Sequence, residues 1–533
     1  MKVLVSEKIA DDGINILREN FDVDVKLGLS NEELQKIIGD YDALIVRSAT
    51  KVTSEVIKKG EKLKVIGRAG TGVDNIDLNA ATTQGIIVVN TPGGNSVAAA
   101  ELAIGLAFSI FRPIPQAYAA GKNKYFSRSS FKGYELYEKT VGIIGLGRIG
   151  SLVAQRLKGM EMNVIAYDPY VQQEAFSKIG VKKCDTLFEL LSESDLITIH
   201  IAKTKETANL LDEKEFSMMK DGVRIVNCAR GGIINETALY NALKSGKVAA
   251  AGLDVLENEP EFELKPEEQT YYNPLLELDN VVYLPHLGAS TIEAQYNVGI
   301  SVAKQVAASL KGEMVPAVNM PAVPANELES LKPYLNLAEN LGKIYFQAEK
   351  NPVSKIEIIY SGDIASKNTK VVTLAFLKGL MSPITSEKVN YVNAEVLVKN
   401  LGIQIVESTT KESKDYTSLI TARFYNGRQL DLAGTVIDKK NVKITDFFGY
   451  YMNFEPSPYV LAVQNIDQPG VIGSMGTILG ANGINIAAMQ VSRNKKGEKA
   501  EAFLSVDGEI PEDVLLKIRE IKAVLKATML RFD

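Results

Sequence analysis

The first ninety residues alternate short runs of apolar, β-branched residues with segments whose apolar positions recur every three or four residues. The short runs predict strands at residues 2–6, 43–47, 64–68 and 86–90. The polar and apolar spacing of residues 31–39 predicts one of the helices between them. Strands that alternate with helices form parallel sheets, because each connection has to cross the sheet. We therefore expect an α/β body here.

A second and stronger series of the same kind follows. Residues 95–120 predict one long, alanine-rich helix, after which nearly continuous apolar runs predict six strands, at 141–145, 163–167, 196–201, 223–227, 250–255 and 281–284. Six such strands separated by helices are typical of a doubly wound fold. A further helix is expected over residues 290–310, and it returns the chain to the first body.

The pattern changes after residue 314. Residues 315–324 contain three prolines and no periodicity, which is typical of a linker. Residues 325–450 form a mixed α/β stretch with a hairpin expected to turn at Asn426-Gly427. The last 75 residues follow the order β-α-β-β-α-β, which predicts a ferredoxin-like split βαβ fold.

Composition excludes several classes of protein. A net charge of −5 argues against a general nucleic-acid binder. The sequence contains no run of 18 apolar residues, so we expect no membrane span. Two cysteines, Cys184 and Cys228, cannot make a disulfide scaffold, so we expect a cytoplasmic protein. Neither a CxxC nor an HExxH motif occurs, and we expect no metal site.

A glycine-rich turn follows the first strand of the second series, as Gly145-Leu146-Gly147-Arg148-Ile149-Gly150. In a dinucleotide-binding turn the first glycine allows a tight turn, the second lets the backbone approach a pyrophosphate, and the third lets the helix pack closely. Asp168 ends the next strand, 18 residues after Gly150. A carboxylate there would hold the ribose hydroxyls and repel a 2′-phosphate. The sequence therefore predicts an NAD site.

Three more strand ends carry groups that could act on a substrate. Arg230 offers a charged fork for a carboxylate. His286, one of two histidines in 533 residues, is a candidate general acid/base. A carboxylate beside it would orient the ring, but spacing alone does not choose between Glu257 and Glu259. The other histidine, His200, is expected to pack or to line the cofactor cleft. Together these groups suggest oxidation of an alcohol by hydride transfer.

These motifs resemble the D-isomer-specific 2-hydroxyacid dehydrogenases, over essentially the whole chain. The marks are VRSATKVT (46–53), GRAGTGVDN (67–75), NTPGGNS (90–96), GLGRIG, NCARGG, ENEP and PHLGAST (285–291). Within that family the chain is similar to the long members that oxidise 3-phosphoglycerate to phosphohydroxypyruvate, the first step of L-serine biosynthesis. The resemblance implies a catalytic triad of Arg230, Glu259 and His286.

The resemblance also carries over binding residues and domains. Cofactor contacts are expected at Thr71, Gly145, Gly147, Arg148, Ile149, Gly150, Asp168, Ile201, Cys228, Ala229, Arg230, Asp254, His286, Gly288 and Ala289. Contacts to the substrate are expected at Arg47, Ser48, Arg68, Gly70 and Asn95. The implied domains are a flavodoxin-like substrate-binding domain (1–94 and 291–316), a Rossmann NAD-binding domain (95–290), an intervening domain (317–456) and a regulatory domain (457–533).

The C-terminal segment resembles an ACT domain. Its marks are Asn465-Ile466-Asp467-Gln468-Pro469-Gly470 and Gly483-Ile484-Asn485-Ile486. Such domains bind amino acids between paired copies, and L-serine is the effector that the family implies. Asp467 would take the amino group and Asn485 would close the site. The alternative is a purely structural dimerisation module.

Two other functions stay open at this point. One is a glyoxylate or hydroxypyruvate reductase on the same scaffold, and the other is a non-catalytic NAD-sensing protein. Arg47 and Arg68, together with the regulatory module, argue against both. We expect a homodimer or homotetramer, with no nucleic-acid or membrane partner.

Overall fold

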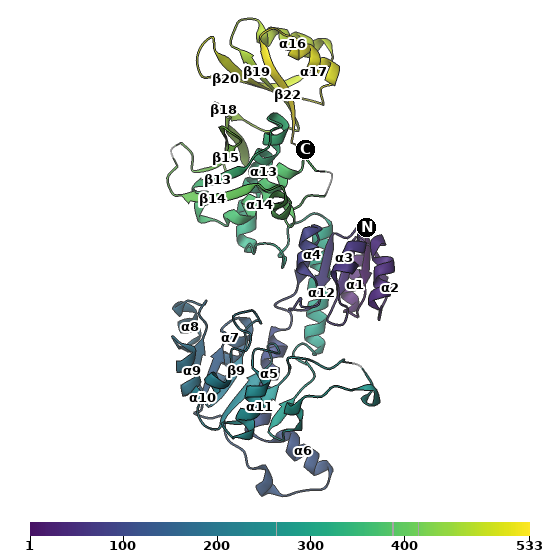
Figure 1. Ribbon diagram of the computed structural model, residues 1–533, viewed down its shortest axis with the longest axis vertical. Helices are drawn as coiled ribbons and strands as arrows, with labels where there is room; N and C mark the ends of the chain where they lie inside the picture. Colours follow the sequence, from purple (N-terminus) through teal and green to yellow (C-terminus); the bar gives the residue numbers. More distant parts are fainter. Residues whose placement is uncertain (263, 386–387, 414, 533) are drawn as a thin grey trace.

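The computed structural model describes residues 1–262, 264–385, 388–413 and 415–532. Four sheets divide this part of the chain among four bodies arranged along the long axis of the molecule (Figure 1). The first body lies between the second, at one end, and the third. The fourth, C-terminal body lies at the opposite end.

Five parallel strands form the first body in the order β2-β1-β3-β4-β5, which is the flavodoxin-like order. The strands are β1 (Lys2–Val5), β2 (Asp22–Val25), β3 (Ala43–Val46), β4 (Val65–Arg68) and β5 (Ile87–Asn90). The helices are α1 (Asp11–Arg18), α2 (Asn31–Ile37), α3 (Ser54–Lys59), α4 (Leu78–Thr83) and, from far along the chain, α12 (Ile292–Leu310). Helix α12 packs on α1 and β4, so the chain does return to this body.

Seven parallel strands form the second body in the order β12-β11-β10-β9-β6-β7-β8. The order reverses between β6 and β9, where a doubly wound sheet binds its ligand. The strands are β6 (Thr140–Ile144), β7 (Asn163–Tyr167), β8 (Lys182–Lys183), β9 (Leu196–Ile199), β10 (Val223–Asn227), β11 (Val248–Leu253) and β12 (Val281–Tyr283). The helices are α5 (Ser96–Phe111), α6 (Ile114–Lys122), α7 (Arg148–Gly159), α8 (Gln173–Ile179), α9 (Leu187–Glu193), α10 (Glu213–Met218) and α11 (Glu236–Lys244).

The single helix expected over residues 95–120 is two helices, which corrects that prediction. Helix α5 ends at Phe111 and α6 begins at Ile114, with a bend of 68° between them. Pro113 explains the break, because it lacks an N–H and forces Arg112 into an extended conformation (φ −118°, ψ 113°). No single helix of the described residues is long and apolar enough to cross a membrane. Taken together, α5 and α6 are long and apolar enough to cross a membrane, but only by length and composition.

The proline-rich segment expected as a linker also covers a sheet edge. Val318 donates its backbone N–H to the Val88 carbonyl oxygen at 2.7 Å. The Asn319 side chain accepts the Val88 N–H at 3.0 Å and donates to the Ile86 carbonyl oxygen at 2.9 Å. These bonds satisfy backbone groups of β5, the outer strand of the first sheet, which would otherwise be exposed for pairing with another chain.

The third body is a mixed sheet in the order β14-β13-β15-β16-β17-β18, in which only β13 and β14 are parallel. The hairpin turns at Asn426-Gly427, where Gly427 has a φ of 90°. The strands are β13 (Lys355–Gly362), β14 (Gln404–Thr410), β15 (Ser418–Tyr425), β16 (Gln429–Ile437), β17 (Asn441–Phe447) and β18 (Tyr450–Phe454). The helices are α13 (Ala325–Ala348), α14 (Thr369–Met381) and α15 (Ala394–Asn400).

The fourth body is a four-stranded antiparallel sheet in the order β20-β21-β19-β22, with two helices on one face. This is the split βαβ arrangement that the sequence predicts. Its elements are β19 (Tyr459–Ile466), α16 (Val471–Ala481), β20 (Ile486–Arg493), β21 (Lys499–Val506), α17 (Glu512–Arg519) and β22 (Val524–Arg531). The described residues also contain short 3₁₀ turns at Ile38–Asp40, Arg128–Phe131, Pro266–Glu268, Pro274–Glu277 and Asp363–Ser366.

The third and fourth bodies share one hydrophobic core. On the face of the fourth sheet opposite its helices, Phe503 contacts Phe447 and Phe454 of the third body, with ring centroids 4.7 and 5.4 Å apart. Val460, Ala462 and Leu530 belong to the same buried cluster. The fourth sheet is therefore covered on both faces, by its own helices and by the third body.

Candidate active site

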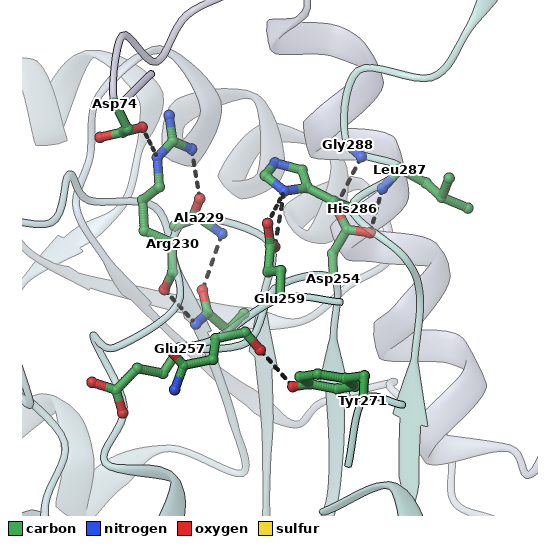
Figure 2. A network of polar contacts seen from close by, with 12 residues as sticks. Asp74, Ala229, Arg230, Asp254, Glu257, Glu259, Tyr271, His286, Leu287 and Gly288 are labelled. Carbon is green, nitrogen blue, oxygen red and sulfur yellow. Dashed lines mark hydrogen bonds and ion pairs between the residues drawn. The ribbon is translucent and has the colours of Figure 1, made fainter. Parts of the chain in front are cut away.

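A histidine and a carboxylate from neighbouring strand ends form a close pair in the second body. His286 Nδ1 lies 2.9 Å from Glu259 Oε1 and 3.1 Å from Oε2 (Figure 2). Because an ionised carboxylate only accepts hydrogen bonds, Nδ1 carries the proton and Nε2 is left for a substrate. Glu257 does not reach the ring. Its backbone N–H donates to the Glu236 carboxylate instead.

The loop that carries His286 is held by Asp254, the residue after β11. The Asp254 carboxylate accepts the backbone N–H groups of Leu287 at 2.7 Å and Gly288 at 2.8 Å. The side chain is buried, and this burial raises the pKa of Asp254 to about 6, although the two N–H donors act in the opposite direction. Asp254 therefore anchors the turn on which the histidine is placed.

Arg230 projects from the loop after β10, the strand beside β11. Asn227 fixes this loop by donating to the Arg230 carbonyl oxygen at 3.0 Å and accepting the Ala229 N–H at 3.0 Å. The guanidinium donates through Nη1 to the Ala229 carbonyl oxygen at 2.7 Å, and its Nε lies 3.6 Å from Asp74 of the first body. Figure 2 shows Arg230 reaching toward Asp74 beside the His286–Glu259 pair. The carboxyl ends of the two parallel sheets therefore meet at this site.

The glycine turn has the geometry that a pyrophosphate requires. Gly145 has a φ of 93°, which favours glycine. A Cβ on Gly150 would lie 2.0 Å from the Gly145 carbonyl oxygen, whereas one on Gly147 would meet nothing within 4 Å. Helix α7 begins directly after Gly147. The open space over Gly147 at a helix N-terminus fits the phosphates of a dinucleotide.

Asp168 lies at the end of β7, where the ribose of a dinucleotide would be. Its carboxylate accepts the N–H of Leu146 at 2.9 Å and of Tyr170 at 3.0 Å. These bonds hold the carboxylate against the glycine turn. The glycine turn and this carboxylate together fit NAD, whose pyrophosphate and ribose need such groups.

The other candidate cofactor residues lie at the start of α7 or after the ends of strands of the same sheet. Arg148 and Ile149 open α7, and Arg148 also donates to the Pro92 carbonyl oxygen of the first body at 3.4 Å. Ile201, Cys228 and Ala229 follow the neighbouring strands β9 and β10, and Gly288 and Ala289 follow the histidine. Burial raises the pKa of the Cys228 thiol, so this group stays protonated.

His200 behaves as the packing residue that the sequence suggests. Its Nε2 lies 2.9 Å from Thr198 Oγ1, and burial lowers its pKa to about 4. The ring is therefore neutral near pH 7. Among the described residues, no group of three or more His, Cys, Asp or Glu could hold a metal ion.

Cations gather where the first sheet faces the second. Arg68 ends β4, and its Nε is buried without a hydrogen-bond partner among the described residues. Burial lowers the pKa of Arg68, and the guanidinium groups of Arg230 and Arg47 lower it further. Gly70 has a φ of 148° and lies under the Arg68 side chain. These arginines make the region electropositive, and Arg68 Nε is a donor without a partner among the described residues.

Two further candidate residues hold each other beside these cations. The Thr71 hydroxyl donates to Asn95 Oδ1 at 2.8 Å, and Asn90 donates to the Thr71 carbonyl oxygen at 2.6 Å. Ser48 lies in the loop after β3, next to Arg47. The structure thus brings the candidate substrate residues of the first body to the carboxyl ends of β3, β4 and β5.

The two candidate effector residues of the fourth body are not brought together. Asp467 follows β19 and is bound by Arg493 at 2.8 Å, while Asn485 precedes β20 and donates to Asp507 at 2.9 Å. The register of β19 and β20 on β21 places these two positions at opposite ends of one sheet. One copy of the chain therefore does not form a site from both residues.

Sequence patterns missed three residues that shape this region. Glu7 accepts backbone N–H groups of the loop after β3, Asn75 donates to its carbonyl groups, and Asp74 contacts Arg230. Asp74 and Asn75 lie inside the GRAGTGVDN motif, so that motif was the available signal for them. Glu7 stands two residues after a strand, and nothing in the local pattern distinguishes it from a solvated acid.

Three protein-family models match successive parts of the chain. Residues 104–288 match the model of the D-isomer specific 2-hydroxyacid dehydrogenase NAD-binding domain. Residues 330–448 match the D-3-phosphoglycerate dehydrogenase intervening domain, and residues 459–523 match the ACT domain.

Similar proteins cover the whole chain. The chain is 47% identical to a D-3-phosphoglycerate dehydrogenase of Methanocaldococcus jannaschii over 98% of each chain. It is 46% identical to one of Archaeoglobus fulgidus over 99% of each. Among solved structures, a D-lactate dehydrogenase from Escherichia coli is 31% identical, with a TM-score of 0.52 over 60% of this chain and 99% of that one. A glyoxylate reductase from Paecilomyes thermophila is 31% identical, with a TM-score of 0.53 over 60% and 98%.

Proposed function

This chain belongs to the D-isomer-specific 2-hydroxyacid dehydrogenases, and we propose that within this family it oxidises 3-phosphoglycerate to phosphohydroxypyruvate with NAD. Its full-length relatives carry the name of that activity, and the two solved structures compared above cover 60% of this chain. The reaction is the first step of L-serine biosynthesis.

The observation that carries this proposal is a set of arginines gathered where the first and second bodies meet. Arg47 and Arg68 come from the first body and Arg230 from the second, and the buried Nε of Arg68 has no partner among the described residues. A substrate with both a carboxylate and a phosphate would satisfy this excess of donors and positive charge. A small 2-oxo acid with one negative charge would leave part of it unused.

In the proposed mechanism His286 is the general base. Its Nε2 takes the proton of the substrate hydroxyl, while Glu259 on Nδ1 fixes the ring and stabilises the imidazolium that forms. The glycine turn and Asp168 would hold NAD, which would supply the hydride acceptor for the carbon that carries the hydroxyl. Arg230 holds the substrate carboxylate and, in the reverse direction, polarises the carbonyl.

Cofactor choice follows from Asp168. Its carboxylate, fixed by the N–H groups of Leu146 and Tyr170, lies where a ribose would bind and would repel a 2′-phosphate. This supports NAD rather than NADP.

Regulation by L-serine at the ACT domain belongs to the proposal. Because Asp467 and Asn485 lie at opposite ends of one sheet, we place the effector between two copies, with Asp467 from one and Asn485 from the other. In the single chain Arg493 pairs with Asp467 and lowers its pKa. An incoming amino group would have to replace Arg493 as the partner of this carboxylate.

A homodimer or homotetramer is the proposed assembly. Large apolar side chains are exposed along α6 and the segment after it, and the extreme case is Phe126, at 76% exposure. The others are Ile114, Tyr118, Tyr125, Tyr134 and Tyr137. A patch of this kind marks an association surface.

We predict that Phe126→Glu weakens the assembly, and sedimentation at micromolar concentration would detect this change. A monomeric wild type would refute the proposal.

The unpaired cysteines are consistent with a cytoplasmic location.

The test of the function is NADH oxidation with phosphohydroxypyruvate, with and without millimolar L-serine. Activity that serine suppresses supports both the catalytic and the regulatory parts. Activity indifferent to serine would leave the enzyme and give the ACT domain a structural role or another ligand. NADH binding without turnover on this substrate would favour a reductase of unphosphorylated acids or an NAD-sensing protein.

A further inference from the structure

Glu7 occupies an unusual position under the loop of residues 47–50, which carries Arg47 and Ser48. Its Oε1 accepts the backbone N–H groups of Arg47 at 2.8 Å and Thr50 at 2.9 Å, and Oε2 accepts that of Ala49 at 3.2 Å. A carboxylate with three backbone donors is held firmly, because charge-assisted hydrogen bonds are the stronger kind. Glu7 itself follows β1, the strand beside β3.

The same loop is fixed from its carbonyl side. Asn75 Nδ2 donates to the Arg47 carbonyl oxygen at 2.8 Å and to the Thr50 carbonyl oxygen at 2.7 Å. Ser6 Oγ also lies 3.1 Å from Thr50 Oγ1. Glu7 and Asn75 thus hold the two ends of the loop in one shape. The N–H of Ser48, at its middle, is not among the groups that Glu7 binds.

The charge of Glu7 also faces the arginines. Glu7 favours the charged form of Arg68, against the burial and the guanidinium groups of Arg230 and Arg47, which lower the pKa of Arg68. A carboxylate here lets two arginines from different strands lie close together before any anion arrives. The cost of gathering like charges is thereby reduced.

We propose that Glu7 is a positioning residue that shapes the loop of residues 47–50 into the subsite for the phosphate of the substrate. It would act through Arg47 and Ser48, and would itself touch neither substrate nor cofactor. The inference rests on the proposed function, because it assigns the phosphate end of 3-phosphoglycerate to this loop. Glu7 would therefore determine specificity for a phosphorylated over an unphosphorylated 2-oxo acid.

The experiment compares phosphohydroxypyruvate with hydroxypyruvate in the full-length enzyme. Glu7→Ala should raise KM for phosphohydroxypyruvate at least tenfold with kcat changed less than threefold, because the loop loses three hydrogen bonds. The kcat/KM for hydroxypyruvate and the KM for NADH should change less than threefold. Glu7→Gln should be milder, since an amide oxygen in the place of Oε1 can still accept the Arg47 and Thr50 N–H groups.

The matched control is Glu189→Ala. Glu189 also accepts a backbone N–H, that of Asp185 at 3.0 Å, but it lies on α9 in the second body. Its kinetics should equal those of the wild type. An equal loss on both substrates, or no loss with Glu7→Ala, would overturn the role of Glu7. A wild type that does not prefer the phosphorylated substrate would instead refute the proposed function.

Discussion

His286 adopts a backbone conformation that is rare for residues other than glycine and asparagine, with a φ of 56°. Its N–H donates to the carbonyl oxygens of Asp254 and Leu284, and Asp254 holds the next two N–H groups. The turn is therefore fixed from both sides, and its geometry aims the imidazole at Glu259. Strained backbone that the surroundings hold in place is common at functional sites.

His286→Asn tests the proton transfer with little change in the turn, because asparagine tolerates a positive φ. We expect kcat to fall by about 10²–10⁴-fold, the usual contribution of a general acid/base. The dissociation constant of NADH, measured by fluorescence titration, should stay within about twofold. Turnover near the wild-type rate would show that another group exchanges the proton.

Gly150→Ala tests the close packing of the dinucleotide turn. The added Cβ would lie 2.0 Å from the Gly145 carbonyl oxygen, so the turn or α7 has to move. Overpacking of this kind costs about 1–3 kcal/mol, and NADH affinity should fall at least tenfold. Calorimetric titration with NADH measures this.

The control for that variant is at the other end of α7. A Cβ on Gly159 would meet nothing within 4 Å, so Gly159→Ala should leave NADH affinity unchanged. If both variants bind NADH equally well, close packing at Gly150 does not matter for the cofactor.

At the scale of elements, the interface between the third and fourth bodies contains one buried acid. Glu501, on β21, is 5% exposed and faces the third body on the same side of the sheet as Phe503. Gln464 on β19 donates to it, with Nε2 3.3 Å from Oε2. Burial raises the pKa of Glu501 to about 7, although Lys526 acts in the opposite direction.

This acid should make the C-terminal half less stable as pH rises. Between about pH 4.5 and 7 the folded protein keeps a proton that the unfolded chain has lost, so stability falls through that window. Glu501→Gln cannot ionise and should be more stable than the wild type by roughly 2–3 kcal/mol at pH 8, with the difference gone near pH 4.5. Denaturant unfolding of both proteins at several pH values measures this.

Glu520→Gln, at an exposed position after α17, is the control and should change neither stability nor its pH dependence. A Glu501→Gln variant with the same pH dependence as the wild type would mean that Glu501 is charged in the folded protein.

Most elements could be predicted from the pattern, because buried parallel strands read as continuous apolar runs. The central strands β7 and β10 have the predicted bounds. Strand β2 was missed because its sequence, Asp-Val-Asp-Val, lies half-exposed at a sheet edge, and β8 is only two residues long. The strand order depends on tertiary packing, and the break at Pro113 depends on a single residue. The helical periodicity of apolar positions reveals neither of them.

The geometry of the candidate site could be predicted where a motif places several groups at a strand end, as with Gly145, Asp168 and His286. The contact of Glu259 with His286 required the resemblance, since Glu257 is equally close in sequence. The roles of Glu7 and Asp74 arise from contacts across 40 and 156 residues. No local periodicity contains such contacts.

At the scale of the whole molecule, the chain divides into two halves, the first two bodies and the last two, which share no cluster of buried residues. The first two bodies hold the candidate active site, while the third and fourth share one cluster of buried residues through Phe447, Phe454 and Phe503. The contacts between the halves include hydrogen bonds such as that of Asn390 Nδ2 to the Gly85 carbonyl oxygen at 2.6 Å. The halves should therefore unfold separately.

Scanning calorimetry with and without NADH tests this division. A ligand stabilises the unit that binds it by an amount that grows with its concentration over its Kd. NADH should raise the midpoint of one transition, by several degrees at a hundredfold excess over Kd, and leave the other in place. A single transition that shifts as a whole would show that the halves unfold together.

The scarcity of histidine, together with the burial of His200 beside Thr198, has a spectroscopic consequence. His200 is neutral down to about pH 4, so its ring does not change charge across the physiological range. With only one other histidine in the chain, ¹⁵N-histidine labelling gives the ring signals of two residues, so those that do not belong to His200 belong to His286. The two ring nitrogens have distinct shifts, and Nδ1 is held by Glu259. The tautomer, the protonation state and the arrival of substrate at Nε2 can therefore be followed in the native enzyme without introducing a probe.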